Sequence, residues 1–263
     1  MKRIAVAAFL GLAACAHPAV QDDPPARPLV LWKGYSDHPP GYLGEHPDPA
    51  IVAFLPPPPA EGSLRARDDA AIYRATRKLE GTPRWKQAAD DSEIFAPDFA
   101  FKAFACALGA EIAPEQAPTL TLMLGRVPAD IDGVTERVKK TTMRKRPVVV
   151  DPRPICLPAA DWLLSSTSYP SGHAATGWAL GLILSELAPD RAGPILTRAA
   201  GIGDSRVICG VHYQSDVEIG RQVGAAVVAV LRARPDFEAD LDAARAELAA
   251  ARRTAPKPSC PTE

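Results

Sequence analysis

The sequence predicts an all-α fold: a single-domain helical bundle preceded by an extended, proline-rich N-terminal arm. Three observations carry this prediction. After residue 63, apolar residues recur at helical spacing, whereas runs of alternating β-branched residues are almost absent. Prolines gather near the N-terminus, with twelve of the 28 between residues 18 and 59. A chain of 263 residues that is 47% hydrophobic is long enough for one large domain with its own core.

The N-terminus has the pattern of an export signal over residues 1–14. Two basic residues precede an apolar stretch that is too short to cross a bilayer as a helix. The sequence LAAC ending at Cys15 is typical of a lipoprotein signal, in which Cys15 would carry a lipid anchor. Ordinary cleavage after residue 16 is the alternative. Both routes predict a periplasmic protein, and the first adds attachment to the outer membrane.

Residues 15–41 are predicted to form a flexible or extended arm, because their prolines interrupt helices. The all-α domain is expected over residues 42–253, followed by a tail over 254–263. Aromatic residues of the proline-rich region favour packing of its second half on the domain; they are Trp32, Tyr35, Tyr42 and Phe54.

The helices are predicted in chain order from periodicity and from their start and stop signals. The first begins after an N-cap at Ser63 and stops at Gly81 and Pro83. The helices at 173–187 and 216–232 are strongly apolar, but their apolar runs are shorter than a membrane span. The last helix, at 236–252, is rich in alanine and charged residues. The remaining predicted helices cover residues 97–111, 116–125, 127–146, 173–187, 216–232 and 236–252.

Charge and cysteine content exclude several classes of protein. A formal net charge of −1 gives no basic field of the kind that binds nucleic acid. Without a CxxC or HxxxH spacing, no metal site and no cofactor are expected. An exported chain with four cysteines beyond the signal can form disulfides, and three pairings are open among Cys106, Cys156, Cys209 and Cys260.

The first polar segment is KKTTMRKRP at residues 139–147. Lys139 and Arg146 are seven residues apart, so both side chains point the same way if the helix continues to Arg146. A cluster of cations like this one can bind an anion. It is also typical of a solvated helix face, or of a helix C-terminus, where the helix dipole is negative.

The second polar segment is SYPSGH at residues 168–173, directly before the most apolar predicted helix. The first turn of a helix has unpaired N–H groups and a partial positive charge, which together bind anions. Ser171 and the N–H of Gly172 are therefore candidate anion ligands, and Ser171 is also a candidate N-cap. His173 begins the helix.

The third polar segment is SRVICGVHYQSD at residues 205–216. Asp216 follows His212 by four residues, so its carboxylate can hold one imidazole nitrogen while the other keeps a free lone pair. That arrangement prepares a histidine as a nucleophile, although a core histidine is the alternative. Arg206 stands beside apolar residues, where burial of a guanidinium is costly unless it meets an anion.

Taken together, the three segments hold cations, N–H donors, two imidazoles and a carboxylate. Phosphoryl transfer needs this set: fixed positive charge around the equatorial oxygens, an in-line nucleophile and an acid for the leaving group. In order along the chain, they resemble the motifs of the type 2 phosphatidic acid phosphatase superfamily. The flanking sequences YLGEHPDPAIVAFLPPPP and RWKQAADD are similar to those of the bacterial class A non-specific acid phosphatases.

The resemblance implies a phosphomonoesterase of broad specificity that needs no metal. It implies that His212 attacks phosphorus and forms a phosphohistidine, that Asp216 orients it, and that His173 protonates the leaving alcohol and later activates water. It also implies transfer to alcohols other than water, an acidic pH optimum, a homo-oligomer and small-molecule phosphomonoesters as substrates. The implied phosphate ligands are Lys139, Arg146, Ser171, Gly172 and Arg206.

Two further functions are open alternatives. A vanadium-dependent haloperoxidase has the same anion cradle but would need vanadate for halide oxidation. A phosphate-binding lipoprotein without turnover would need the basic residues but not two histidines and an aspartate.

Overall fold

The computed structural model describes residues 29–44, 47 and 49–260, and the regular structure within them is entirely helical. The predicted all-α fold is therefore confirmed. The predicted export signal over residues 1–14, the candidate anchor at Cys15 and the cleavage after residue 16 lie outside the described residues. Among the described helices, none combines the length and the apolar character needed to cross a bilayer.

Short 3-10 turns connect several of the α-helices. The α-helices are α1 (Leu64–Thr76), α2 (Pro83–Asp90), α3 (Phe99–Leu108), α4 (Pro118–Thr142), α5 (Pro147–Val150), α6 (Asp161–Ser165), α7 (Gly172–Leu187), α8 (Ala192–Cys209), α9 (Gln214–Leu231) and α10 (Pro235–Thr254).

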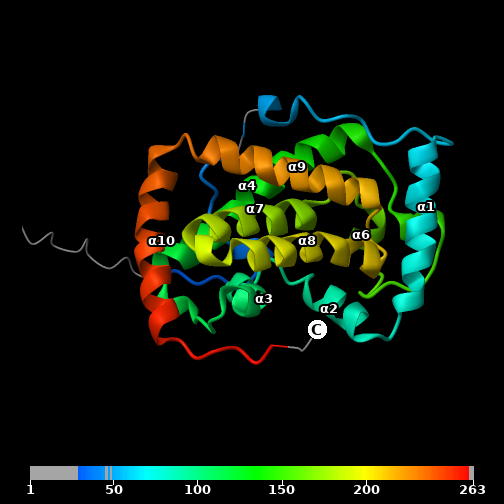
Figure 1. Ribbon diagram of the computed structural model, residues 1–263. Coiled ribbons are helices and arrows are strands. Elements are labelled where there is room, and N and C mark those ends of the chain that lie inside the picture. Colours follow the sequence, from blue (N-terminus) through cyan, green and yellow to red (C-terminus); the bar gives the residue numbers. More distant parts are fainter. Residues whose placement is uncertain (1–28, 45–46, 48, 261–263) are drawn as a thin grey trace, which may run out of the picture.

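Helix α7 is the centre of the bundle and packs along both α8 and α9 (Figure 1). In this view α4, α7, α8 and α9 run through the middle of the molecule, while α10 crosses one end and α1 the other. The main core lies between these helices, with fully buried Phe104, Met123, Leu180, Ile183 and Phe237.

Glycines let the central helices approach one another closely. A Cβ on Gly181 of α7 would overlap the Cβ of Ala199 on α8, and one on Gly224 of α9 would overlap the carbonyl oxygen of Ala175 on α7. Small residues at these crossings bring the backbone of α7 close to both neighbours. The N-terminus of α7 is thereby fixed near the ends of α8 and α9.

The structure differs from the predicted helices in several places, because α2, α5, α6 and α8 were not predicted and two predicted helices are one. Residues 116–125 and 127–146 were predicted as separate helices, but α4 is continuous through Pro128 and ends at Thr142, where Met143 adopts a left-handed φ of 49°. Arg146 therefore lies outside α4. Helix α8 was not predicted, because its glycines and proline give it low intrinsic helix propensity. Tight packing on α7 outweighs that propensity.

Two aromatic residues of the proline-rich region, Trp32 and Tyr42, pack on the domain as predicted. Trp32 is buried and its Nε1 donates to the carbonyl oxygen of Phe95 at 2.7 Å. Tyr42 is buried and its hydroxyl donates to Asp240 at 2.8 Å. The prediction was wrong for Phe54, which is 60% exposed. The side chain of Tyr35 lies outside those described.

Two disulfides settle the pairing that the sequence left open. Cys106 pairs with Cys260 and joins α3 to the segment after α10. Cys156 pairs with Cys209 and joins the segment before α6 to the C-terminus of α8. The predicted tail is thus held to the domain through Cys260.

Candidate active site

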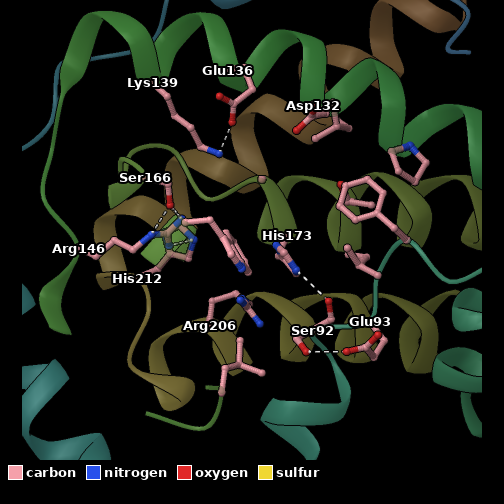
Figure 2. Close-up of a pocket in the computed structure, with 18 of the residues that line it drawn as sticks. Ser92, Glu93, Asp132, Glu136, Lys139, Arg146, Ser166, His173, Arg206 and His212 are labelled. Carbon is pink, nitrogen blue, oxygen red and sulfur yellow. Dashed lines mark hydrogen bonds and ion pairs between the residues drawn. The ribbon is translucent and has the colours of Figure 1, made fainter. Parts of the chain in front are cut away.

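A cavity of about 850 Å³ opens between α4, α7, α8 and the segments around residues 92–95 and 157–166. Six of the eight predicted site residues line it (Figure 2). Because they come from three separate parts of the chain, the fold has brought the three polar segments together. The six are Lys139, Arg146, Gly172, His173, Arg206 and His212.

His212 lies in the turn between α8 and α9 and is 2% exposed. Its Nε2 accepts a hydrogen bond from Nη1 of Arg146 at 3.0 Å, because a guanidinium can only donate. The neutral ring therefore carries its proton on Nδ1, which lies 3.5 Å from Oδ2 of Asp216. Nε2 is the nitrogen with a lone pair on the cavity side. Asp216 lies beside Nδ1 as expected, whereas the lone pair of Nε2 accepts from Arg146, and the role of His212 as nucleophile stays a prediction.

Burial lowers the pKa of His212 well below its usual value, and the charges of Arg146 and Arg206 lower it further. The ring is consequently neutral at neutral pH in the absence of an anion. A neutral ring is the form that can attack an electrophile.

Asp216 is fully buried behind His212, outside the cavity lining. Its Oδ1 accepts from Arg144 at 2.6 Å, and its Oδ2 accepts from the Ser168 hydroxyl at 2.5 Å and from the N–H of Tyr213 at 2.8 Å. Burial raises the pKa of Asp216, while Arg144 and these donors oppose that shift. Four contacts, including His212, thus fix the carboxylate.

Arg144 and Ser168 were not assigned roles from the sequence. Arg144 also donates to Asp69 at 2.8 Å and to Ser215 at 2.8 Å, and it lies over the ring of Tyr213. One signal in the sequence could have pointed to Arg144. A buried carboxylate such as Asp216 needs a cation, and the segment that contains Arg144 is rich in cations. Arg144 is two residues before Arg146 but points to Asp216 instead of the cavity.

Arg146 precedes α5 and is 5% exposed. Its Nε and Nη2 donate to the Ser166 hydroxyl at 3.1 and 3.0 Å, and its Nη1 donates to the carbonyl oxygen of Val211 at 2.8 Å. Burial lowers the pKa of Arg146 to about 10, against the opposing charge of Asp216. The guanidinium is therefore held in place beside His212 and remains charged at neutral pH.

Arg206 lies on the last turn of α8 and is 2% exposed. Its Nε and Nη1 are buried and have no hydrogen-bond partner within the described residues. Burial lowers its pKa to about 9, and Arg146 contributes to that shift. Two orphaned donors on a buried cation are costly unless an anion accepts from them. The guanidinium lines the cavity, so that anion would lie there.

His173 is the second residue of α7 and keeps part of its surface in the cavity. Its Nε2 donates to the carbonyl oxygen of Ser92 at 3.1 Å, so Nδ1 is the nitrogen available for proton transfer. Burial lowers the pKa of His173 well below its usual value, and Arg206 lowers it further. A bound anion would oppose both shifts.

The remaining predicted phosphate ligands occupy two different positions. Lys139 on α4 lines the cavity, where its Nζ pairs with Glu136 at 2.7 Å, and Gly172 lines it at the first turn of α7. Ser171 does not reach the lining: its hydroxyl accepts from the N–H of Ala174, which makes it the N-cap of α7. The N-cap role is thus present, and because the hydroxyl keeps a hydrogen to donate, the role of Ser171 as a phosphate ligand stays a prediction.

Within the described part of the chain, no group of three or more His, Cys, Asp or Glu side chains is arranged to hold a metal ion. Positive charge at the cavity therefore comes from Lys139, Arg146 and Arg206. Two imidazoles lie with these cations, and the carboxylate of Asp216 lies beside one of them. Groups of these types are suited to an oxyanion and to proton transfer.

Comparisons with known proteins place the chain in a family. Residues 120–239, which contain all eight predicted site residues, match the model of the PAP2 superfamily. A solved bacterial vanadium-dependent iodoperoxidase superposes with a TM-score of 0.50 at 18% identity, over 68% of this chain and 53% of that chain. This likeness shows a shared fold alone. The class of protein is thus a PAP2-type helical bundle.

Two curated relatives are similar over most of the chain. An acid phosphatase of Zymomonas mobilis subsp. mobilis is 39% identical over 216 residues, which are 81% of this chain and 80% of that protein. A non-specific acid phosphatase of Providencia stuartii is 40% identical over 200 residues, which are 75% of this chain and 80% of that protein. The chain therefore belongs to the PAP2 superfamily and, within it, to the bacterial non-specific acid phosphatases.

Proposed function

We propose that this protein is a phosphoric monoester hydrolase that acts without a metal and through a phosphohistidine at His212. Membership of a family of phosphatases supports the hydrolase activity. The observation that carries the site assignment is Arg206, whose buried and unpaired Nε and Nη1 face the cavity that also contains both imidazoles. A phosphate group supplies the acceptor oxygens that this guanidinium needs.

In the first step Nε2 of His212 attacks phosphorus, an N–P bond forms and the ester P–O bond breaks. Arg146 donates to Nε2 in the free enzyme and would transfer that hydrogen bond to an incoming phosphate oxygen. His173 gives a proton to the leaving alcohol from Nδ1. The negative charge of the bound ester favours the protonated form of His173, against the burial that disfavours it.

In the second step water attacks the phosphohistidine. His173 now accepts the water proton, the N–P bond breaks, and inorganic phosphate leaves while His212 returns to its neutral form. Asp216 stabilises the positive charge that develops on the ring of His212 during the first step. An alcohol that replaces water in this step would give a phosphotransferase reaction.

The decisive experiment is to trap the intermediate. Full-length His212→Ala should neither release p-nitrophenol from p-nitrophenyl phosphate nor retain labelled phosphate after a rapid quench. His173→Ala is the matched control: p-nitrophenolate leaves without protonation, so this variant should still form a base-stable phosphoenzyme and then hydrolyse it slowly. Normal turnover by His212→Ala would reject His212 as the nucleophile.

Metal independence and the alternative functions are tested with the same protein. Turnover should persist in EDTA, and vanadate should inhibit competitively because it mimics five-coordinate phosphorus. Loss of turnover on chelation would contradict the metal-free mechanism. Vanadate-dependent halide oxidation without phosphate release would identify a haloperoxidase, and phosphate binding without turnover would identify a binding protein.

Export to the periplasm, a lipid on Cys15 and homo-oligomerisation are part of the same proposal. Two disulfides are consistent with an oxidising compartment. Cell fractionation and the mass of the mature N-terminus would distinguish lipidation at Cys15 from cleavage after residue 16.

A further inference from the structure

The proton on the His173 ring is placed by a carbonyl oxygen that lies outside α7. Nε2 of His173 donates to the carbonyl oxygen of Ser92 at 3.1 Å, which leaves Nδ1 for proton transfer (Figure 2). Ser92 belongs to a short turn after α2, in which its N–H donates to the carbonyl oxygen of Ala89 at 3.0 Å. If this turn moved away from α7, Nε2 would lose its acceptor and the ring would be free to change its tautomer. The turn after α2 therefore needs an anchor.

Asp91, the residue before Ser92, anchors this turn to α8. Its side chain is 2% exposed, and both carboxylate oxygens accept from the guanidinium of Arg198, with Nη1 3.1 Å from Oδ2. The hydroxyl of Ser205 donates to Oδ2 at 2.6 Å, and Nη1 of Arg84 donates to that hydroxyl at 2.9 Å. Because Arg198 and Ser205 belong to α8, the Asp91 carboxylate joins the C-terminal end of α2 to α8.

Asp91 is also close to a cation that would hold the phosphate. Burial and the charge of Arg146 lower the pKa of Arg206, and the charge of Asp91 opposes that shift. Every phosphomonoester would share this effect, because each brings the same phosphate group to Arg206. An effect that passes through the Ser92 carbonyl oxygen would instead depend on how much the leaving alcohol needs a proton from His173.

We propose that Asp91 is a positioning residue for His173: it fixes the carbonyl oxygen of Ser92 as the acceptor of the Nε2 proton and so keeps Nδ1 available to the leaving group. This inference rests on the proposed role of His173 as the general acid. Asp91 lies outside the cavity lining, whereas Ser92 and His173 are part of it. Asp91 therefore acts through Ser92 and not on the substrate.

The measurement is the dependence of kcat/KM on the leaving group. Three esters with increasingly basic leaving groups are p-nitrophenyl phosphate, phenyl phosphate and 2-hydroxyethyl phosphate. Because p-nitrophenolate leaves without a proton and an alkoxide does not, a fault in general acid catalysis lowers kcat/KM most for the last ester. Since kcat/KM reports the step that forms the phosphoenzyme, slow hydrolysis of this intermediate does not mask the effect.

The principal variant is full-length Asp91→Asn. Its amide keeps one acceptor oxygen but turns an NH2 group toward Arg198 or Ser205, which loosens the anchor. We expect kcat/KM to fall at least about tenfold more for 2-hydroxyethyl phosphate than for p-nitrophenyl phosphate, within the range that general acid catalysis supplies. His173→Ala should show the same pattern with a larger ratio. The double variant Asp91→Asn/His173→Ala should show the ratio of His173→Ala alone, because no ring is left to position.

Asp240→Asn is the matched control. Asp240 is also a 2% exposed carboxylate; it accepts from the Tyr42 hydroxyl at 2.8 Å and lies 3.6 Å from Nη1 of Arg126. It belongs to α10 and lies outside the cavity lining. This variant should lower the free energy of unfolding but keep the wild-type dependence on the leaving group.

Ser205→Ala provides a second, milder test. It removes one donor to Asp91 and should shift the ratio in the same direction, which keeps the inference testable if Asp91→Asn does not fold.

An equal loss of kcat/KM for all three esters in Asp91→Asn would overturn this inference, as would additive effects in the double variant. Asp91 would then be an anchor of the fold alone. If Asp91→Asn does not fold, an unchanged ratio in Ser205→Ala has the same meaning. Failure of the proposed function looks different: His173→Ala itself would then show no dependence on the leaving group, and the role of His173 would be rejected together with this inference.

Discussion

The three cations of the cavity differ in what holds them before a ligand arrives. Arg146 has hydrogen bonds to Ser166, Val211 and His212 and is fixed in advance. Lys139 is held by an ion pair with Glu136. Arg206 has two donors that no described residue accepts. A bound anion would therefore offset the desolvation cost of Arg206 more than that of the other two cations. For this reason Arg206 is the strongest indicator that the ligand is negatively charged.

Arg144 is predicted to act as a positioning residue for Asp216. Replacing it by leucine leaves the buried carboxylates of Asp216 and Asp69 without their shared cation. We expect Arg144→Leu to lower the free energy of unfolding by about 3 to 5 kcal/mol, since a broken buried pair leaves uncompensated charge. We expect kcat to fall at least tenfold, because the ring of His212 loses its orientation. Urea unfolding and steady-state kinetics measure the two effects.

Two variants separate charge from geometry. Lys145→Leu removes an exposed cation from the same segment and should change stability by no more than about 0.5 kcal/mol. Arg144→Lys keeps the charge but lacks the planar fork whose two nitrogens reach Ser215 and Asp216 on one side and Asp69 on the other, so intermediate kcat is expected. Equal kcat in Arg144→Leu and the wild type would show that Asp216 is held without it.

At the scale of elements, the sequence predicted most helices because their apolar residues repeat with a clear period. It could not predict α8, whose glycines lower its helix propensity; the glycines that the close α7–α8 crossing requires, Gly177 and Gly181, are on α7. It also placed Lys139 and Arg146 on one helical face. Both line the cavity, but α4 ends at Thr142 and Arg146 reaches the site from an extended segment. Tertiary packing decides such helix ends.

The two disulfides connect different elements and should have different effects when removed. The chain-entropy model gives at most about 4 kcal/mol for Cys156–Cys209, which encloses 53 residues, and about 5 kcal/mol for Cys106–Cys260, which encloses 154. The first pair joins the cavity wall near Leu157 to the end of α8, close to Arg206. Cys156→Ser/Cys209→Ser should therefore lower stability and also raise KM at least threefold.

The Cys106→Ser/Cys260→Ser variant is the matched control, because that pair lies outside the cavity lining. It should lower the unfolding free energy by a similar amount and leave KM for p-nitrophenyl phosphate unchanged. Equal KM values in both variants would show that Cys156–Cys209 supports the fold but not the cavity wall.

At the scale of the whole molecule, the fold brings six of the eight predicted site residues to one cavity, and their roles stay predictions. His173, His212 and Arg206 were recognisable because each stands in an apolar or turn-forming context, whereas Arg146 stands in a run of cations and was singled out by the motif resemblance. Their convergence depends on α7 packing between α8 and α9, which periodicity does not encode. The acidic part of the cavity lining was not predictable, because Glu93 and Asp132 resemble ordinary surface carboxylates until the fold places them on one cavity.

Asp130 joins the proline-rich region to α4 beside the cavity wall. It is 2% exposed, and its carboxylate accepts from the N–H groups of Tyr42 at 3.0 Å and Leu43 at 2.7 Å. Burial raises its pKa to about 6, although these two donors and the charges of Arg126 and Arg234 oppose the shift. The folded protein therefore keeps this proton at pH values where the unfolded chain has lost it.

The sign of the resulting pH dependence follows from linkage. Below about pH 4 Asp130 is protonated in both states, and between about pH 4 and 6 only the folded state holds the proton, so stability falls as pH rises through this window and then levels off. The shift corresponds to roughly 3 kcal/mol as an upper value. Urea unfolding of the wild type and Asp130→Asn at several pH values should show their stability difference changing by 1 to 3 kcal/mol, as an order of magnitude. A constant difference from pH 4 to 7 would show that Asp130 is ionised in the folded protein.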